Sequence, residues 1–199
     1  MKLIRAIALL LAGILIIALA TAAFMPETME VEGSIEINKP VEEVFNHVAD
    51  LRNWHAWNPW SEMDPEATHE ISTPSRGKGA KWSWTGEKLG KGSLQQQEIE
   101  ENEMIRFSLV FEEPMESSGI DTWYFERTED NTTLVTWKDE MAMEYPHGRL
   151  ATLFVKPGLE EQLNRGLQKL KALIEKDAAP TPQPASPPAD SAGLRVSGI

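Results

Sequence analysis

Two aspartates and one histidine are the residues of this chain whose types and positions could support acid–base chemistry. Asp121 and Asp139 fall in phase with aromatic residues in segments that alternate like strands, so either carboxylate could point into the fold. His55 stands among tryptophans, whose rings could exclude water from its imidazole. Positioned groups of these types transfer protons in enzymes. His55 and Asp121 are therefore the catalytic candidates, beside the commoner alternatives of a solvated carboxylate near a strand end and a structural histidine.

Three tryptophans lie close together in the first third of the sequence. Trp54, Trp57 and Trp60 are separated by only two residues each. Tryptophan buries a large apolar area and keeps an N–H group that needs a partner. We expect Trp54 to close one end of the core, and we expect Trp57 and Trp60 to shape the mouth of a cavity.

The composition argues against metal, cofactor and nucleic-acid chemistry. The chain has no cysteine and four histidines, and no two histidines show the spacing of metal ligands. The segment Arg76-Gly77-Lys78-Gly79 lacks the residue order of a phosphate-binding loop. The formal net charge is −12, whereas nucleic-acid-binding proteins usually have a basic face. We predict no metal, no cofactor and no nucleic-acid partner, and the sequence does not identify a protein partner.

The N-terminal residues have the composition of a membrane-spanning segment. Ala6–Met25 contains no charged residue, and about 20 apolar residues match the thickness of a bilayer. Lys2 and Arg5 precede this run, so the positive-inside rule keeps the N-terminus in the cytoplasm. We predict one inner-membrane pass through residues 3–25, with the following domain in the periplasm or outside the cell. The alternative is a signal peptide cleaved at Ala20-Thr21-Ala22, which would release the domain into the periplasm.

The chain divides into three parts by composition. Residues 1–26 form the anchor or signal peptide, residues 27–176 a folded domain, and residues 177–199 a tail rich in proline and alanine. The tail has too few bulky apolar residues to offset the entropy lost on ordering, so we expect it to be disordered. Its alternative role is a proline-rich docking segment.

The spacing of apolar residues in the domain changes along the chain. A period of two at Val31–Ile37 predicts a first strand, and spacings of three and four at Val41–Leu51 predict a short helix. From Thr68 to Met143 the period is again mostly two, which predicts six antiparallel strands. Leu159–Ile174 carries a helical stripe. The segment Lys156-Pro157-Gly158 predicts a break between this helix and a shorter element before it.

This order of elements, together with several local motifs, resembles the SRPBCC superfamily of START-related helix-grip proteins, and in particular its bacterial polyketide cyclase/dehydrase-like branch. The resemblance spans roughly residues 31–175. The motifs that carry it are Ile35-Glu36-Ile37-Asn38-Lys39-Pro40, Trp57-Asn58-Pro59-Trp60, Gly77-Lys78-Gly79-Ala80, Thr133-Leu134-Val135-Thr136-Trp137 and Leu167-Gln168-Lys169-Leu170-Lys171.

The resemblance implies an α+β helix-grip fold, with a curved antiparallel sheet of about seven strands around a long C-terminal helix and two short helices after the first strand. It also implies a hydrophobic cavity between sheet and helix. The residues expected to bind a ligand there are Trp57, Trp60, Trp82, Trp84, Phe107, Leu109, Trp123, Phe125, Trp137, Leu163 and Leu167.

Three classes of function fit this sequence. The first is a membrane-tethered extracytoplasmic binding protein for a hydrophobic small molecule or lipid, without catalysis. The second is a polyketide cyclase or dehydratase-type enzyme that uses the same cavity. The third is a protein-interaction or envelope-stress module with a filled core and no ligand. A cavity with a buried titratable group favours the enzyme, an apolar cavity favours the carrier, and a solid core favours the interaction module.

Overall fold

The computed structural model describes residues 1–176, and the predicted disordered tail at 177–199 lies outside the described residues. The helices are α1 (Lys2–Phe24), α2 (Val41–Ala49), the 3-10 helix η1 (Leu51–Ala56), α3 (Trp60–Met63) and α4 (His147–Lys176). The strands are β1 (Thr28–Ile37), β2 (Thr68–Ile71), β3 (Lys81–Gly86), β4 (Gly90–Glu100), β5 (Met104–Glu113), β6 (Ser117–Arg127) and β7 (Thr133–Ala142). These elements confirm the predicted α+β helix-grip fold.

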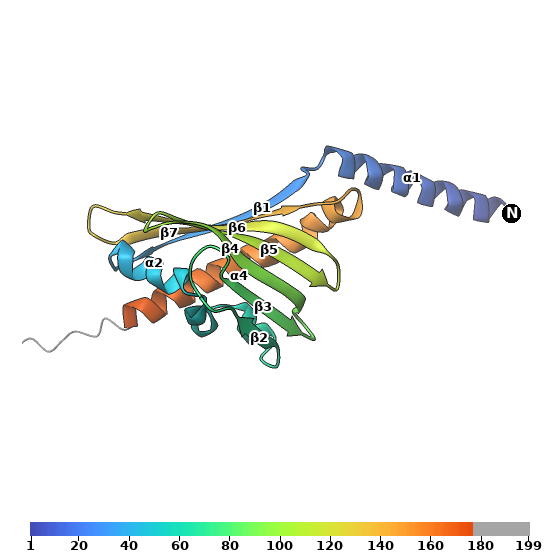
Figure 1. The fold of residues 1–199 in the computed structure, drawn as a ribbon. Helices are drawn as coiled ribbons and strands as arrows, with labels where there is room; N and C mark the ends of the chain where they lie inside the picture. The colour runs from blue at the N-terminus through green and yellow to red at the C-terminus, as the bar shows by residue number, and fades with distance from the viewer. Residues whose placement is uncertain (177–199) are drawn as a thin grey trace, which may run out of the picture.

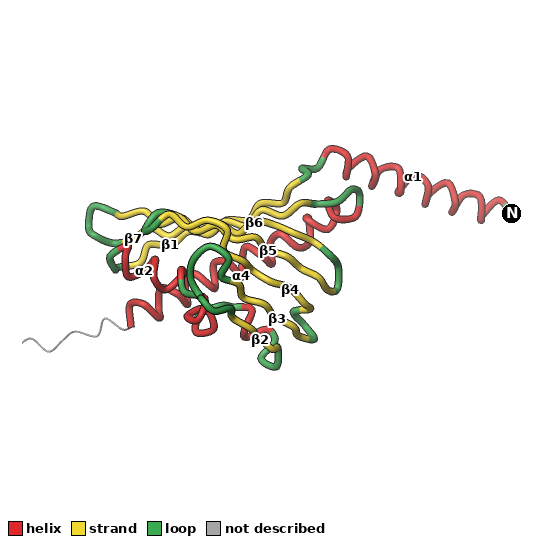
Figure 2. The backbone as a smooth tube through the Cα atoms, in the orientation of Figure 1, coloured by secondary structure: helices red, strands yellow, loops and turns green. Residues whose placement is uncertain are grey.

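The seven strands form one antiparallel sheet in the order β1-β7-β6-β5-β4-β3-β2. Strands β2 to β7 follow one another as a meander, and β1 joins at the β7 edge. The β4–β5 pairing shifts register between Lys91 and Gly92 and again between Gln96 and Glu98. Irregularities of this kind bend and twist a sheet. Figures 1 and 2 show α4 running along one face of the sheet, with α2 near the C-terminal half of α4.

The core between the sheet and the short helices is built around Trp54. This side chain is 2% exposed, and its Nε1 donates a hydrogen bond to the carbonyl oxygen of Val48 at 2.7 Å. Its ring centroid lies 5.0 Å from that of Trp57 and 5.3 Å from that of Phe107. The hydrogen bond removes the cost of burying the indole N–H, so a residue with a polar atom can occupy the centre of the core.

The C-terminal half of α4 packs on the sheet through the predicted apolar stripe. Leu163, Leu167, Leu170 and Ile174 are all buried. Gly166 permits close contact, because a Cβ atom at this position would lie 2.8 Å from Cζ3 of Trp137. The helix therefore lies directly against the Trp137 ring of β7.

The predicted break at Pro157 is wrong, because α4 is continuous from His147 to Lys176 and contains Pro157. A proline inside a helix removes one backbone hydrogen bond, the one its N–H would donate to the carbonyl of Leu153. Leu153 is 59% exposed, so solvent can reach this turn. The helix consequently tolerates the proline where a fully buried helix would leave a carbonyl without a partner.

The apolar helix α1 precedes the sheet and is long enough to cross a membrane. Most of its side chains are exposed, but Ala22 is buried. The hydroxyl of Tyr145 donates to the carbonyl of Leu19 at 3.2 Å, and Arg149 donates to the Met25 carbonyl at 3.4 Å and to Glu27 at 2.8 Å. The first turn of α4 and the loop before it thus contact the end of α1 (Figure 1).

Candidate ligand-binding site

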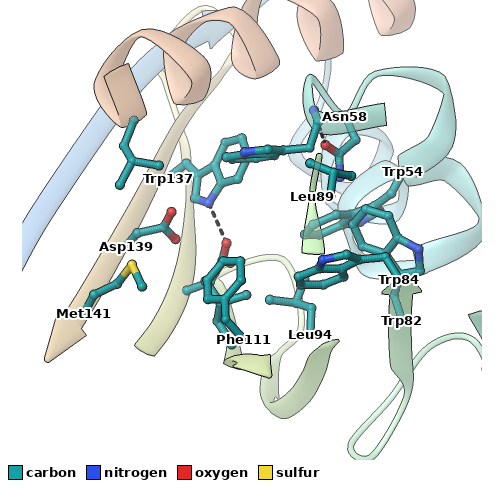
Figure 3. A pocket seen from close by; sticks show the side chains of 14 residues that line it. Trp54, Asn58, Trp82, Trp84, Leu89, Leu94, Phe111, Trp137, Asp139 and Met141 are labelled. Atoms are coloured by element: carbon teal, nitrogen blue, oxygen red, sulfur yellow. Dashed lines mark hydrogen bonds between the residues drawn. The ribbon is translucent and has the colours of Figure 1, made fainter. Parts of the chain in front are cut away.

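A cavity of about 90 Å³ lies between the sheet, the loop after α2 and helix α4. Figure 3 shows the side chains that surround it. The lining residues are Trp54, Asn58, Trp60, Trp82, Trp84, Leu89, Leu94, Leu109, Phe111, Asp121, Trp137, Asp139, Met141 and Leu159. Every one of them except Asn58 and the two aspartates is apolar or aromatic.

One wall of the cavity is formed by the indole rings of β3. Trp82 and Trp84 are two residues apart and therefore share a face of the strand, with ring centroids 5.5 Å apart. Gly92 is opposite Trp84 in the β3–β4 register. A Cβ atom at Gly92 would lie only 2.4 Å from Cζ2 of Trp84. Because glycine has no side chain, the Trp84 ring can lie directly over β4 at this position.

The open side of the cavity lies at the end of the sheet that joins α1. Trp60, Phe111, Met141 and Leu159 are half-buried, in contrast to the fully buried residues deeper inside. Met141 is opposite Met29 in the register, and Met29 is the second residue of β1. Because β1 follows α1 directly, the mouth and the N-terminal helix are at the same end of the domain.

Two carboxyl groups line the same cavity. Asp121 on β6 and Asp139 on β7 are directly opposite each other in the antiparallel register, and they are only 3% and 5% exposed. Nε1 of Trp137 donates to Oδ2 of Asp121 at 2.7 Å, as the dashed line in Figure 3 shows. Within residues 1–176, Oδ1 of Asp121 and Oδ1 of Asp139 have no hydrogen-bond partner.

The environment of this carboxyl pair favours its protonated form. Burial and the nearby Asp139 carboxylate raise the pKa of Asp121 well above its ordinary value. Burial raises the pKa of Asp139 from 3.8 to about 6. Two like charges held together in a region of low polarity ionise one after the other. Between these two ionisation steps the pair holds one proton and one negative charge, so it contains both a proton donor and a proton acceptor.

The histidine predicted as an acid–base group lies elsewhere. His55 is exposed and outside the cavity lining. Its ring meets that of His69 edge to face, with centroids 5.9 Å apart, and His69 in turn stacks on Trp82. The neighbouring tryptophans point inward from η1 and do not cover His55. Among the described residues, Asp121 and Asp139 are thus the titratable groups that line the cavity, and no cluster of three potential metal ligands is present.

The structure separates the predicted ligand-binding residues into two groups. Trp60, Trp82, Trp84, Leu109 and Trp137 line the cavity, as does the catalytic candidate Asp121. The others pack in the core outside the cavity lining, namely Trp57, Phe107, Trp123, Phe125, Leu163 and Leu167. Trp54 and Trp57 are both buried, and of the two only Trp54 also lines the cavity, whereas Trp57 was expected at its mouth.

Several lining residues were absent from the predicted set. Phe111, Asp139 and Met141 have the strand phase of predicted residues, so the alternation contained a signal for them. Leu89 lies in the turn between β3 and β4, and Asn58 lies in the loop before α3, where its Oδ1 accepts a hydrogen bond from the Trp60 backbone N–H at 2.9 Å. Periodicity carries no information about such loop residues.

Residues 28–175 match the sequence model of a family described as polyketide cyclase / dehydrase and lipid transport. No curated protein matches the chain significantly. Among solved structures, TTHA0849 from Thermus thermophilus is 19% identical, with a TM-score of 0.54 over 76% of this chain and 100% of that one. The Aha1 dimer from Colwellia psychrerythraea is 16% identical, with a TM-score of 0.53 over 74% and 96% of the two chains. Identities this low show a shared fold alone.

Proposed function

The chain belongs to the polyketide cyclase / dehydrase and lipid transport family, and from this premise we propose that it is a membrane-tethered binding protein for a hydrophobic small molecule or lipid. The observation that carries the proposal is the aromatic cavity between the sheet and α4. Ligand sites are typically concave and mostly apolar, with a few polar groups that set orientation. The cavity has this composition, with a carboxyl pair as its main polar feature.

The size of the cavity indicates how a ligand would enter. Its volume is about 90 Å³, whereas sites for drug-sized ligands occupy roughly 300–1,000 Å³. A ligand larger than a small ring must therefore displace side chains at the mouth. Trp60 and Leu159 are only partly buried and lie on short helix α3 and on α4. Their movement would enlarge the site without disturbing the β-sheet.

The N-terminal helix supports a role at the membrane. The mouth of the cavity and α1 lie at the same end of the domain, and Arg149 links α4 to the residues just after α1. A ligand that partitions into the bilayer would then have a short path to the cavity. The lysine and arginine before the apolar run favour an extracytoplasmic domain. Cleavage of α1 as a signal peptide would instead give a free periplasmic carrier.

Binding of a neutral apolar fluorescent probe, N-phenyl-1-naphthylamine, tests the proposal. The full chain in detergent micelles should bind the probe above a blank of empty micelles. Leu109→Trp should weaken binding at least tenfold, because Leu109 lines the cavity and the larger ring would fill it. Ser108→Trp is the matched control, since the adjacent residue on β5 points to the opposite face. No binding by the parent, or equal binding by Leu109→Trp, would reject the proposal.

The buried carboxyl pair supports a second candidate function, that of an acid–base enzyme. A protonated carboxyl beside a carboxylate could donate a proton to a leaving hydroxyl group while the other accepts a proton from the substrate. Such proton transfers are what a dehydration or an aldol-type cyclisation requires. Any turnover found with a candidate substrate should be abolished by Asp121→Asn while probe binding is retained. Unchanged turnover in this variant would exclude the pair as the acid–base group.

A further inference from the structure

We propose that the cavity recognises a hydrophobic amine, whose ammonium group binds to Asp121 and Asp139 while its apolar part lies among the tryptophans of β3 and η1. This inference rests on the proposed binding function and specifies the class of ligand. The cavity has two chemically different ends. Figure 3 shows Asp139 and Trp137 on one side of the space and Trp54, Trp82 and Trp84 on the other. A ligand with one cationic end and one apolar end matches this division.

The carboxyl pair lacks a positively charged partner in the domain. Oδ1 of each aspartate is buried, and no residue among 1–176 outside the pair donates a hydrogen bond to it; the two carboxyl groups can hydrogen-bond each other when one of them is protonated. The other lining residues on η1, α3, β3, β4, β5, β7 and α4, and in the connecting loops, carry no charge. Lys138, the residue before Asp139 on β7, faces the opposite side of the sheet, where it pairs with Glu30 and Glu140. A buried charge without a counterion is costly, and a bound ammonium group would remove that cost.

An ammonium group matches the hydrogen-bonding needs of the site. It carries up to three N–H donors and no acceptor, and the site offers unpartnered carboxyl oxygens. The Trp137 ring lies beside the pair, since its Nε1 bonds to Asp121, and the Trp60 ring is 5.6 Å from it between centroids. The Trp137 N–H already bonds to Oδ2 of Asp121, so an ammonium group would bind to the Oδ1 atoms. A carboxylate or phosphate head group would instead be repelled by the pair.

The charge outside the cavity has the same sign. A groove at the ends of β5 and β7 and the start of β6 shares Phe111 with the cavity lining and contains Glu112, Glu116 and Glu144, of which Glu112 pairs with Lys91. The whole chain has a formal net charge of −12. Negative charge around an entrance raises the local concentration of cations and lowers that of anions. The net charge of the chain thus disfavours the approach of fatty acids and anionic head groups.

The protonation state of the pair fits a singly charged ligand. Burial raises the pKa of Asp139 to about 6, and burial with repulsion from Asp139 raises the pKa of Asp121 well above its ordinary value. Between its two ionisation steps the pair holds one negative charge. One ammonium group would neutralise it, whereas a divalent cation would leave an uncompensated positive charge in an apolar cavity.

Three ligands that share one apolar part and differ in head-group charge test this inference. They are 4-phenylbutylamine, 4-phenylbutan-1-ol and 4-phenylbutanoic acid. The full chain in detergent micelles is titrated with each at pH 7.5 by displacement of the neutral probe, with empty micelles as the blank. We expect the amine to bind at least tenfold more tightly than the alcohol, and the acid to bind more weakly than both.

Variants of the pair show whether the aspartates cause the preference. Asp121→Asn combined with Asp139→Asn should remove the preference for the amine and retain binding of the alcohol, which also shows that the cavity is intact. If the double variant fails to fold, the preference for the amine is measured in the single variant Asp139→Asn, where it should be weaker than in the parent. Glu140→Gln is the matched control, because it removes a carboxylate from the other face of β7 and should leave the preference unchanged.

The outcomes separate this inference from the binding function on which it rests. Binding of the alcohol as tightly as the amine would overturn the amine proposal and leave hydrophobic binding intact. An amine preference that survives in both pair variants would also overturn it, since the pair would not be its cause. Failure of the parent to bind either the probe or any member of the series would overturn both proposals together.

Discussion

Replacement of Asp139 by asparagine should change how the stability of the domain depends on pH. The pKa of the Asp139 carboxyl is about 6 in the folded protein, raised by burial from its ordinary value of 3.8. An amide has nearly the same shape as a protonated carboxyl group and does not ionise. Asp139→Asn therefore fixes the neutral form that the cavity favours, with little change in packing.

The direction of the effect follows from proton binding. Between about pH 4 and pH 6 the folded state holds more protons than the unfolded state, because its pKa is the higher one. The free energy of unfolding of the parent then falls as the pH rises through this interval. The shift in pKa is about two units, and each unit corresponds to about 1.4 kcal/mol, so the loss is about 3 kcal/mol above pH 6. Asp139→Asn avoids this loss.

Thermal unfolding of the full chain in detergent, followed by near-ultraviolet circular dichroism from pH 4 to pH 8, measures the difference. The parent and Asp139→Asn should unfold at similar temperatures at pH 4. At pH 8 the variant should be more stable, and about 3 kcal/mol corresponds to a rise of roughly 6–12 °C in Tm for a domain of this size. Glu140→Gln, on the outer face of the same strand, serves as the control and should show no such rise.

Two outcomes of this comparison would refute the expected effect of Asp139→Asn. If Asp139→Asn lowers Tm at pH 8, or if the difference between variant and parent is the same at pH 4 and pH 8, the carboxyl is not held in its neutral form by burial. Comparison at each pH cancels the titration of the exposed carboxylates, because the parent and the variant share them. If the variant instead became less stable than the parent as the pH rises, the fold would stabilise the ionised form of Asp139.

Three further predictions concern packing and processing. Gly92→Ala should destabilise the domain by about 1–3 kcal/mol in urea unfolding, because the added Cβ would overlap the Trp84 ring, and no loss would mean that this ring can move aside. Trp123→Ala should cost about 3–5 kcal/mol, because the ring is fully buried. Trp60→Ala should cost less stability than Trp123→Ala, since the half-buried ring at the mouth has fewer contacts to lose. Equal losses of stability in the two variants would argue against an open mouth. N-terminal sequencing of the mature protein should find α1 still present, and a chain that starts at Ala23 would identify a signal peptide instead.

Sequence periodicity was sufficient to predict the strands and the faces of the strands. Alternation in β5, β6 and β7 placed Phe107, Trp123 and Trp137 on one face of the sheet, and all three are buried there. The same phase brought Asp121 and Asp139 to that face. This works because side chains on a strand alternate strictly, so the residue pattern determines which side faces the core.

Periodicity could not distinguish a core position from a cavity wall. Phe107 and Leu109 share one face of β5, yet only Leu109 lines the cavity. The difference depends on which loop or helix side chains cover each position, and these come from distant parts of the chain. The burial of Trp57 away from the cavity has the same cause, because the short helices after α2 have no long apolar stripe that fixes their orientation.

The amino-acid sequence by itself determined the order of strands and helices and the apolar N-terminal helix, because both depend on residues that are neighbours in sequence. It also determined the negative charge of the chain, which depends on composition alone. Only the tertiary structure decided that Asp139 lies opposite Asp121, through the β6–β7 register, that His55 faces solvent, and that α4 continues through Pro157. Register and solvent access depend on contacts between distant segments, and these contacts set the chemistry of the cavity.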